Sequence, residues 1–593
     1  MTFNTHDQVP DSPTNNFATL NSLDAEATSL SDGNLDAGIN NGPNNSTTII
    51  PLSGTWYWEV YIRDHTNIYM GIQKIETQAT GYSQDAVAVN NTGNIYYDSI
   101  YQNIDALPNI ATGDTISVFW NIDNNMIWFA QNGQFYDATG TSHPPLTLSQ
   151  VANGVNGYDY SNNIPYRAKP FFGSSAPSAY ITCNFGQDSS FGGRKTSGSA
   201  YASDANGIGN FYYQPPTGAL ALCSANLPKP STDPNNNESP DNYFKTISWD
   251  GTGSPSQDIN VGFWVDFIWV KRTNGGDHHY LYDITRTEND HLESDNDNPE
   301  GTDDYGLDFV DYGGKIQVES NKYFNNSGNS FVAWCWTAGG AQVNSTNPYA
   351  KNGNLYSSLN SAGIPTGQLT PTRMSINTQS GFSIIKYDGT SGTNTRVPHG
   401  LSSTPELIII KNLDYSSHWV VGSEYMTSWR YAMNLSEPNQ EVNYGYNVFR
   451  SDPNSSFFYL GYSVEAKHPS FHYIAYCWHS VPGYSAIGKY TGNGNSDGPF
   501  IHTGFKPALV ITKRSNGNGQ WILEDNERNP INPVDNVLYA NDQNQAGTTS
   551  NTIDFLSNGF KIRHSAWSDQ NGTSATIIYM AFAEQPGKYS NAR

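Results

Sequence analysis

Apolar and polar residues alternate over short runs along most of this chain, and residues that form turns, above all glycine and asparagine, separate the runs. The run that starts at Gly54 and ends at Ile62, Gly-Thr-Trp-Tyr-Trp-Glu-Val-Tyr-Ile, is typical of a half-buried strand. No segment of 12 or more residues keeps a helical period. The pattern therefore predicts an all-β protein built from strands, hairpins and long loops.

One phrase recurs three times in the last 350 residues: a glycine-rich turn, an apolar strand closed by lysine, and a strand built on aromatic-Ala-aromatic. The three passes cover residues 251–253, 267–272 and 331–336; residues 389–392, 407–411 and 473–478; and residues 492–494, 509–514 and 579–583. From Gly251 to Lys271, Gly389 to Lys411 and Gly492 to Lys513 the interval is 20, 22 and 21 residues. From these lysines to Ala333, Ala475 and Ala581 it is 62, 64 and 68 residues. The agreement predicts a triplicated β module, and repeated display modules favour binding or assembly over a single catalytic centre.

The remaining boundaries follow from changes in composition. Residues 1–50 are a polar arm with one or two edge strands, which is either a docking segment or the first strands of the next domain; residues 51–190 are a β-sandwich. Stretches rich in Gly, Ser, Pro and Asn predict linkers. The expected order is a linker at 191–241, a first repeat at 242–340, a linker at 341–379, a second repeat at 380–480 and a third at 481–593.

The net charge of −24 argues against nucleic acid as a partner, because binding a nucleic-acid backbone requires clustered positive charge. The charge also disfavours anionic membrane surfaces. The first residues show no secretory leader, and no stretch approaches about 18 consecutive apolar residues, so we expect synthesis in a cytoplasm and no insertion into a membrane. Cys335 and Cys477 occupy equivalent strand positions, where the third repeat has Ala583, and are interpreted as small core residues.

The first predicted sandwich contains four motifs, in this order: Gly-x-Trp-Tyr-Trp-Glu-Val from Gly54, Asp-x-Ile-x-Val from Asp114, Ile-x-Phe-x-x-Asn-Gly from Ile127 and Asn-Phe-Gly from Asn184. Together they resemble a SPRY (B30.2-like) domain. The resemblance implies two packed antiparallel sheets and recognition of protein or glycan through loops at one end. The loops match nothing that identifies a ligand.

A second resemblance runs nearly from end to end. Residues 11–21, 30–35, 219–228 and 579–586, together with the SPRY-like strand, resemble large structural proteins of marine tailed bacteriophages. The resemblance implies a virion component, of the tail-fibre-like kind, with no established catalytic residues.

The sequence contains weak signals for chemistry. Residues 494–498 match Gly-x-Ser-x-Gly, but a strand follows rather than the helix of a nucleophile elbow, which favours a hairpin loop. An acidic run offers four carboxylates to calcium, with a solvated loop as the competing interpretation: Asp295, Asp297, Asp303 and Asp304. His278 and His279 lack a third ligand at zinc-like spacing, and no other cofactor is indicated.

Exposed aromatic residues are the most plausible binding chemistry, since Trp and Tyr rings stack on sugars and anchor interfaces. Five candidates lie outside the repeated strands, with packing in the core or in hairpins as the competing interpretation: Tyr158, Tyr160, Trp429, Trp521 and Trp567.

We therefore expect a non-enzymatic virion protein, a tail-fibre or tail-associated adhesin that binds a glycan or protein on the host surface. A head-decoration or tail-architecture protein that binds other virion proteins is the alternative, and a polysaccharide depolymerase is the third. Repeated weak contacts gain from multivalency, so a homo-oligomer, for instance a trimer, fits the first reading.

Overall fold

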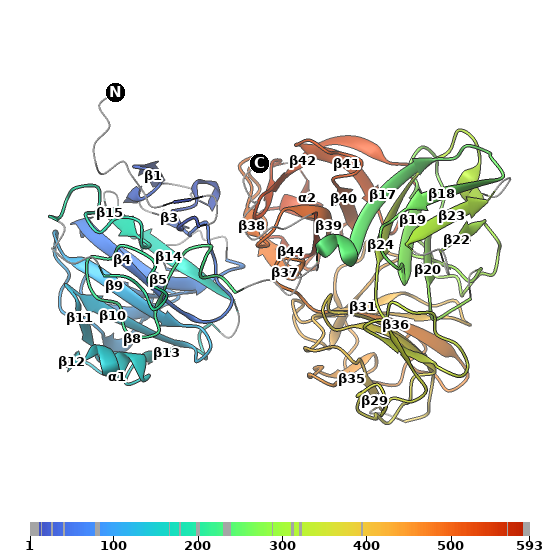
Figure 1. The fold of residues 1–593 in the computed structure, drawn as a ribbon, viewed down its shortest axis with the longest axis horizontal. Coiled ribbons are helices and arrows are strands. Elements are labelled where there is room, and N and C mark those ends of the chain that lie inside the picture. The colour runs from blue at the N-terminus through green and yellow to red at the C-terminus, as the bar shows by residue number, and fades with distance from the viewer. Residues whose placement is uncertain are drawn as a thin grey trace. The chain divides into compact units, whose positions relative to one another are not determined.

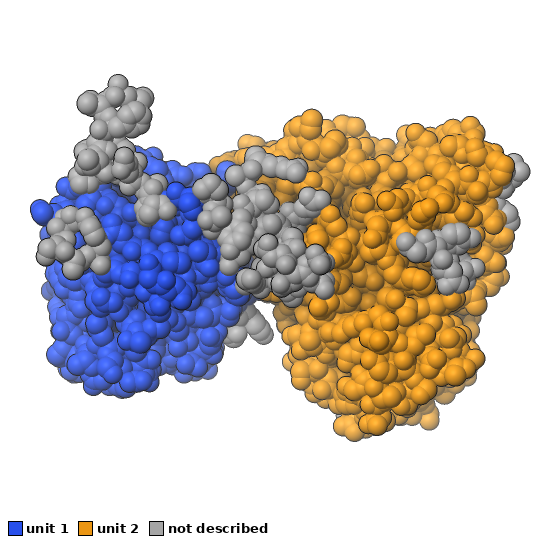
Figure 2. Space-filling view, in the orientation of Figure 1, with its two compact units in different colours: residues 1–228 blue, residues 229–593 orange. Residues whose placement is uncertain are grey.

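The computed structural model describes residues 11–584, except 13–14, 25–27, 40–41, 78–82, 165–166, 177–178, 197–201, 229–238, 288, 310–313, 320–322, 393–394 and 566. The chain divides into two compact units, residues 1–228 and residues 229–593 (Figure 2). Nearly all regular structure is β, which confirms the predicted fold class (Figure 1). The described helices are short, and none is long and apolar enough to cross a membrane.

The first unit is a sandwich of two antiparallel sheets. The larger sheet runs, in spatial order, β1 (Thr28–Ser31), β2 (Asp36–Ile39), β15 (Ala179–Asn184), β4 (Thr55–Asp64), β9 (Thr115–Asn121), β10 (Met126–Gln131), β11 (Gln134–Tyr136) and β12 (Pro145–Leu146); β13 (Tyr158–Asp159) pairs with β10 and β16 (Leu220–Ala221) with β4. The smaller sheet runs β3 (Gly42–Asn45), β14 (Ala168–Ser174), β5 (Ile68–Lys74), β6 (Ala86–Asn90), β7 (Asn94–Tyr97) and β8 (Ile100–Asp105). Trp58 of β4 and Met70 of β5 are fully buried in one core between the sheets.

Local sequence explains the hairpins and the one short helix of this unit. Asn132 and Gly133 both have positive φ and form the two-residue turn between β10 and β11, as expected for Asn-Gly. Helix α1 (Leu148–Ala152) begins with a capping box, in which Thr147 accepts from the amide of Gln150 while the Gln150 side chain binds back to Thr147.

The predicted linker at 191–241 is wrong for its first part. Phe211, Ala219 and Leu222 are fully buried, and β16 pairs in parallel with β4, so residues 202–227 complete the first unit. The side chain of Asp204 holds this segment by accepting from the amides of Ile208 and Ala221, both at 2.8 Å. Residues 229–238 lie outside the described residues.

The second unit contains three chain segments, which we call segment 1 (residues 239–338), segment 2 (residues 339–480) and segment 3 (residues 481–584). Their strands are as follows. Segment 1 has the sheet β17 (Phe244–Asp250), β24 (Ser330–Trp336), β19 (Phe267–Arg272), β20 (His279–Asp283), β21 (Leu292–Glu293) and the sheet β18 (Ser256–Asn260), β23 (Lys315–Glu319), β22 (Leu307–Asp308). Segment 2 has the sheet β26 (Asn354–Tyr356), β25 (Tyr349–Lys351), β27 (Arg373–Asn377), β28 (Phe382–Asp388), β36 (His472–Trp478), β30 (Leu407–Asn412), β31 (Val420–Ser423), β32 (Tyr431–Asn434), β33 (Val442–Asn443) and the sheet β29 (Thr395–Pro398), β35 (Phe457–Leu460), β34 (Phe449–Ser451). Segment 3 has the sheet β37 (Ser485–Thr491), β44 (Thr576–Ala583), β39 (Pro507–Arg514), β40 (Ile522–Asp525), β41 (Val534–Tyr539), β42 (Gly547–Leu556), β43 (Gly559–Ile562), β38 (Phe500–His502), and the short helix α2 (Ser568–Asn571).

The inner part of each segment has the same strand order. β17-β24-β19-β20-β21 in segment 1 matches β28-β36-β30-β31-β32 in segment 2 and β37-β44-β39-β40-β41 in segment 3. The register also agrees, because Phe267, Leu407 and Leu509 pair with Trp336, Trp478 and Phe582. The three segments lie around a common centre in Figure 1 (green, yellow to orange, and red).

This register corrects the alignment read from the sequence. The residue of segment 3 that corresponds to Cys335 and Cys477 is Ala581, not Ala583. The position of Ala333 and Ala475 is taken by Tyr579. The error is a shift of two residues, and side chains two apart on a strand share a face, so the apolar pattern alone does not detect it.

The predicted linker at 341–379 is also wrong. It contributes β25, β26 and β27, which extend the inner sheet of segment 2 beyond β28. Met374 and Ile376 of β27 are fully buried. The Asn352-Gly353 turn of the β25–β26 hairpin gave this stretch its linker-like composition.

Candidate functional site

The inner sheets of the three segments meet in one apolar core. Phe267, Trp336, Trp478 and Phe582 are among the residues that line its centre, where a cavity of about 20 Å³ remains. Such a space has room for about one water molecule. The centre of the second unit is therefore a packed core rather than a ligand site.

The same pair of main-chain hydrogen bonds joins each segment to the next. Ser417 and Glu300 bind segment 2 to segment 1, through Ser417 N to Asp297 O (3.0 Å) and Glu300 N to Leu413 O (2.9 Å). The corresponding bonds between segments 3 and 2 are Gly519 N to Pro438 O (2.8 Å) and Glu441 N to Ser515 O (2.9 Å), and those between segments 1 and 3 are Asp277 N to Gln543 O (2.9 Å) and Ala546 N to Thr273 O (3.0 Å). The second unit is thus a closed ring of three junctions.

A buried lysine stands at each junction, at the end of the strand where the sequence repeats it. Lys411 Nζ donates to the carbonyls of Asn412, Ser417 and Asp297, and Lys513 Nζ to those of Gly519, Pro438 and Asn439. Burial lowers the pKa of Lys271 and Lys411 to about 8 and that of Lys513 to about 7. Lys411 and Lys513 thus donate across their junctions to main-chain carbonyls, whereas Lys271 Nζ donates to the carbonyls of Arg272 and Gly275 in its own segment.

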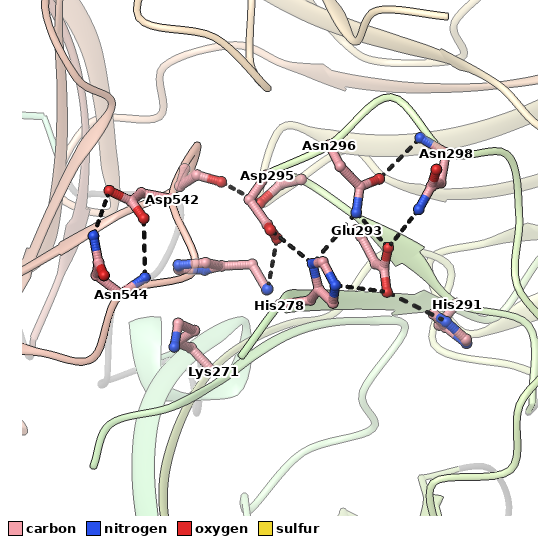
Figure 3. A network of polar contacts seen from close by, with 12 residues as sticks. Lys271, His278, His291, Glu293, Asp295, Asn296, Asn298, Asp542 and Asn544 are labelled. Carbon is pink, nitrogen blue, oxygen red and sulfur yellow. Dashed lines mark hydrogen bonds and ion pairs between the residues drawn. The ribbon is translucent and has the colours of Figure 1, made fainter. Parts of the chain in front are cut away.

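Figure 3 shows the polar network around His278 and Glu293, near Lys271, at the junction of segments 1 and 3. His278 Nδ1 lies 2.7 Å from Asp295 Oδ2, a contact that raises the pKa of His278. Glu293 lies between His278 and His291, at 3.9 and 4.0 Å. Asn296 and Asn298 donate to the second oxygen of Glu293. These contacts join the residues of the network to one another, while the buried Nδ1 of His291 has no hydrogen-bond partner among the described residues.

The predicted calcium site does not assemble. Asp295 accepts from His278 and from the amide of His279, and Asp297 accepts from Ser436 in segment 2. Asp303 and Asp304 bind their own neighbours Tyr305 and Gly306. Among the described residues, no three of these four carboxylates converge on one point.

The five predicted aromatic residues do not form an exposed surface. Tyr158 and Tyr160 lie in the core of the first unit, and Trp429 and Trp521 lie in the second, with at most 7% of any of these side chains exposed. Trp521 Nε1 donates to the carbonyl of Asn434 across a junction, at 2.9 Å. Trp567 is half-buried against Tyr539 and His564. The competing interpretation, packing in cores and hairpins, applies to these residues.

Other aromatic side chains of segment 2 are exposed or half-buried and lie in contact with one another. We call them the aromatic row: Tyr462, His468, Phe471 and Tyr415. Their ring centroids are 5.9, 5.0 and 5.3 Å apart in that order, and the last pair is nearly parallel at 22°. Tyr415 is 52% exposed and Tyr462 46%.

Buried polar residues hold the row in place. Asn412 Oδ1 accepts from the amides of Asp414 and Tyr415 (3.0 and 3.1 Å), and its Nδ2 donates to Val464 O (2.9 Å) in the other loop. Tyr473 Oη donates to the same carbonyl and accepts from the amide of His468 (2.8 Å). Asn412 and Tyr473 are both fully buried, so the two loops that carry the row are fixed before any ligand arrives.

Hydrogen-bonding groups flank the row. His472 Nδ1 lies 2.8 Å from Asp414 Oδ2, and its Nε2 lies 3.8 Å from Asp388 Oδ1. All three side chains are well exposed. Exposed aromatic rings beside carboxylates and an imidazole can stack on the apolar face of a sugar ring and accept hydrogen bonds from its hydroxyl groups.

A separate polar pocket of about 310 Å³ opens at the junction of segments 1 and 3. Asp250 and Glu527 line it, and each accepts from a serine hydroxyl, Ser330 at 2.6 Å and Ser248 at 2.7 Å. Its two acidic side chains come from different segments, Asp250 from segment 1 and Glu527 from segment 3.

Comparison with known proteins adds two family matches. Residues 239–586 match the model described as "Domain of unknown function (DUF7483)", which covers more than half of the chain. The chain belongs to the DUF7483 family. The DUF7483 region contains the whole ring of three segments, the aromatic row included.

Residues 55–146 match the SPRY domain model, which confirms the SPRY resemblance of the first unit. Three similar solved structures are SPRY domains: that of human HERC1 (14% identity, 28% of this chain and 96% of that chain, TM-score 0.22), the PSpry domain of TRIM65 (12%, 28% and 92%, 0.21) and a human SPRY domain (15%, 27% and 94%, 0.19). No curated protein matches the chain significantly.

Proposed function

We propose that this chain is a non-enzymatic structural protein of a bacteriophage virion, a tail-fibre or tail-associated adhesin that binds host-surface glycan through the aromatic row. The observation that carries the proposal is the row itself: four aromatic rings in successive contact, one pair of them stacked, on two loops fixed by Asn412 and Tyr473. The bacteriophage assignment rests on the sequence resemblance alone.

The chemistry of the row suits a glycan. Sugar rings carry an apolar face and a rim of hydroxyl groups, and the row offers aromatic faces next to Asp414, Asp388 and His472. The loops need not be ordered on binding, so the entropic cost is small. Each site binds weakly, and a homo-oligomer such as a trimer would raise the avidity.

We also propose that the three segments are copies of one module. The shared strand order, the shared register, the junction lysines and the repeated pair of main-chain bonds support this descent. We call the three inner sheets and the junctions between them the frame. In this account the frame supplies rigidity, and loops found in a single segment supply recognition.

A non-enzymatic role is supported by where the perturbed carboxyl groups lie. Burial raises the pKa of Glu59 to about 7 and that of Glu524 to about 8. Both side chains are fully buried. Glu59 is bound by the amides of Tyr212 and Tyr213, and Glu524 by Gln570, which leaves neither in reach of a substrate.

The closed ring favours one alternative, a head-decoration or tail-architecture protein whose partners are other virion proteins. A rigid block with its aromatic core sealed is what a packing element requires. In that case the SPRY domain of the first unit is the natural surface for protein partners.

The test is binding of the isolated full chain to a microarray of bacterial lipopolysaccharide and capsular glycans. We expect selective binding by the wild type and at least about tenfold weaker binding by Tyr415→Ala combined with Tyr462→Ala, because aromatic anchors dominate such sites. Trp567→Ala is the control, since Trp567 lies on segment 3. Equal binding by the double variant and the wild type would remove the row from the account.

Two further readouts separate the alternatives. Antibody labelling of intact particles in the electron microscope should mark the tail or its fibres, whereas label spread over the head would replace the adhesin with a decoration protein. Release of reducing ends from a bound polysaccharide, abolished by Asp250→Asn, would instead indicate a depolymerase.

A further inference from the structure

Three metal-ligating side chains from separate loops converge at the junction of segments 1 and 2. Asp297 follows β21, His418 precedes β31 and Glu437 follows β32. His418 Nδ1 lies 3.0 Å from Asp297 Oδ2 and 3.5 Å from Glu437 Oε1. The three ligand atoms all lie within 4.8 Å of one another.

The nitrogen of His418 that faces the carboxylates is buried and lacks a hydrogen-bond partner, although 36% of the side chain is exposed. Native structures rarely leave such an atom unsatisfied, and an ion is one of the few explanations for it. An imidazole nitrogen that faces two carboxylate oxygens, at 3.0 and 3.5 Å, is an arrangement that suits ligands around a shared cation.

Outer hydrogen bonds orient both carboxylates toward His418. Ser436 Oγ donates to Asp297 Oδ1 at 2.7 Å. Asn434 and Asn439 donate to Glu437 Oε2. In each case the other oxygen faces the imidazole, and such outer partners are typical of metal sites.

The charges and the ligand set indicate the class of ion. Two carboxylates face the imidazole, while the ammonium group of Lys411 donates to the main-chain carbonyl of Asp297. One nitrogen and two oxygens suit Zn²⁺ or a similar transition ion, whereas Ca²⁺ takes six to eight oxygens. We infer that Asp297, His418 and Glu437 bind a divalent transition-metal ion of the Zn²⁺ class, which links segment 1 to segment 2.

The other two junctions lack this set. The position of His418 is taken in segment 1 by His278, whose Nδ1 is bound to Asp295, and in segment 3 by Gln520, which accepts from Asn541. We therefore expect one such ion per chain, bound at the junction of segments 1 and 2.

The test is titration of the full chain, free of any tag, with ZnCl₂ alone in an isothermal calorimeter. We expect one equivalent to bind in a saturable way and the melting temperature to rise with it. His418→Ala and Glu437→Gln should each weaken this binding at least about tenfold, because losing a ligand costs no less than losing an outer partner. His278→Ala is the matched control and should keep the equivalent.

Two results would overturn the inference: no saturable Zn²⁺ binding by the wild type, or His418→Ala and Glu437→Gln binding as the wild type does, which would assign the ion to other surface histidines. If circular dichroism shows that His418→Ala is unfolded, the result for Glu437→Gln alone decides the test. Competition with excess CaCl₂ should leave the bound Zn²⁺ in place, and displacement by Ca²⁺ would also contradict the assigned class.

Discussion

Segments 2 and 3 have the same inner sheet and the same junction lysine, yet only segment 2 carries the aromatic row. The difference begins one residue after the lysine, where segment 3 has Arg514 and segment 2 has Asn412. The guanidinium of Arg514 lies over Gly517, so a side chain there would collide with it. Tyr415 occupies the corresponding position in segment 2, where the shorter Asn412 leaves room for it.

Segment 1 follows the rule of segment 3, since Arg272 lies over Gly275 in the same way. In segments 1 and 3 an arginine side chain therefore lies over a glycine of the turn. In segment 2 the turn carries Tyr415 at that position. We therefore expect the frame and the proposed binding surface to be separable: residues of the frame should govern stability, and residues of the row should govern binding.

The largest effect should come from the frame. Trp478 is 4% exposed and stacks on Phe382 at 4.6 Å in the central core. Trp478→Ala should lower the free energy of unfolding of the second unit by about 3–5 kcal/mol, the usual cost of a large aromatic residue in a core. Urea denaturation followed by tryptophan fluorescence and circular dichroism measures this change. A loss below about 1 kcal/mol would mean that the three inner sheets do not share one core.

Removing a junction lysine should change how stability depends on pH. The folded pKa of Lys513, about 7, lies below the ordinary lysine value, so between about pH 7 and pH 10 the unfolded chain binds more protons. This lysine therefore makes stability rise with pH in that window, by at most about 1.4 kcal/mol per pH unit. Lys513→Met should flatten that rise.

The measurement for Lys513 is the free energy of unfolding at a series of pH values from 7 to 10. Lys315→Met, a substitution of an exposed lysine on β23, is the control and should leave the slope of the wild type. If Lys513→Met keeps the full slope, the amine is not the group responsible.

An intermediate effect should follow at the contact between frame and row. Asn412→Ala removes the acceptor of two amides and one of the two donors to the Val464 carbonyl, which Tyr473 still bonds, and we expect a cost of about 1–3 kcal/mol. It should also weaken glycan binding, because the two loops lose their connection. Stability and array binding measured on the same preparation test both parts, and a variant that binds as tightly as the wild type would show that the row does not need Asn412.

The smallest effect on stability should come from the row. Tyr415→Ala removes an exposed ring, so the free energy of unfolding should change by no more than about 0.5 kcal/mol while glycan binding falls. The pair Trp478→Ala and Tyr415→Ala therefore dissociates the two properties within one segment. A large loss of stability in Tyr415→Ala would place this residue in the frame.

The frame was predictable from sequence because strand alternation and the lysine positions recur at nearly constant intervals. The one misalignment, Ala583 for Ala581, arose because a period of two cannot distinguish positions two apart. The prediction of linkers was wrong for another reason. Stretches rich in Gly, Ser, Pro and Asn look alike whether they are free or, like residues 202–227, bound to a sheet through Asp204 and a parallel strand.

The candidate site could not be predicted in the same way. Whether an aromatic ring is exposed depends on distant chain that packs over it, as Asn434 of segment 2 does for Trp521 of segment 3. One local signal was present: Tyr415 and Tyr462 lie within turns, outside the strand alternation. The stacking of the row needed the fold, because Asn412 and Val464 are 52 residues apart.

The central claim is that loops of a single segment, on a rigid ring, recognise a glycan. The most direct test compares the wild type with Tyr415→Ala/Tyr462→Ala on one bacterial glycan array, with melting curves recorded for both. The account predicts unchanged melting and at least about tenfold weaker glycan binding by the double variant. Glycan binding that survives in the double variant, or binding lost only together with the fold, would contradict it.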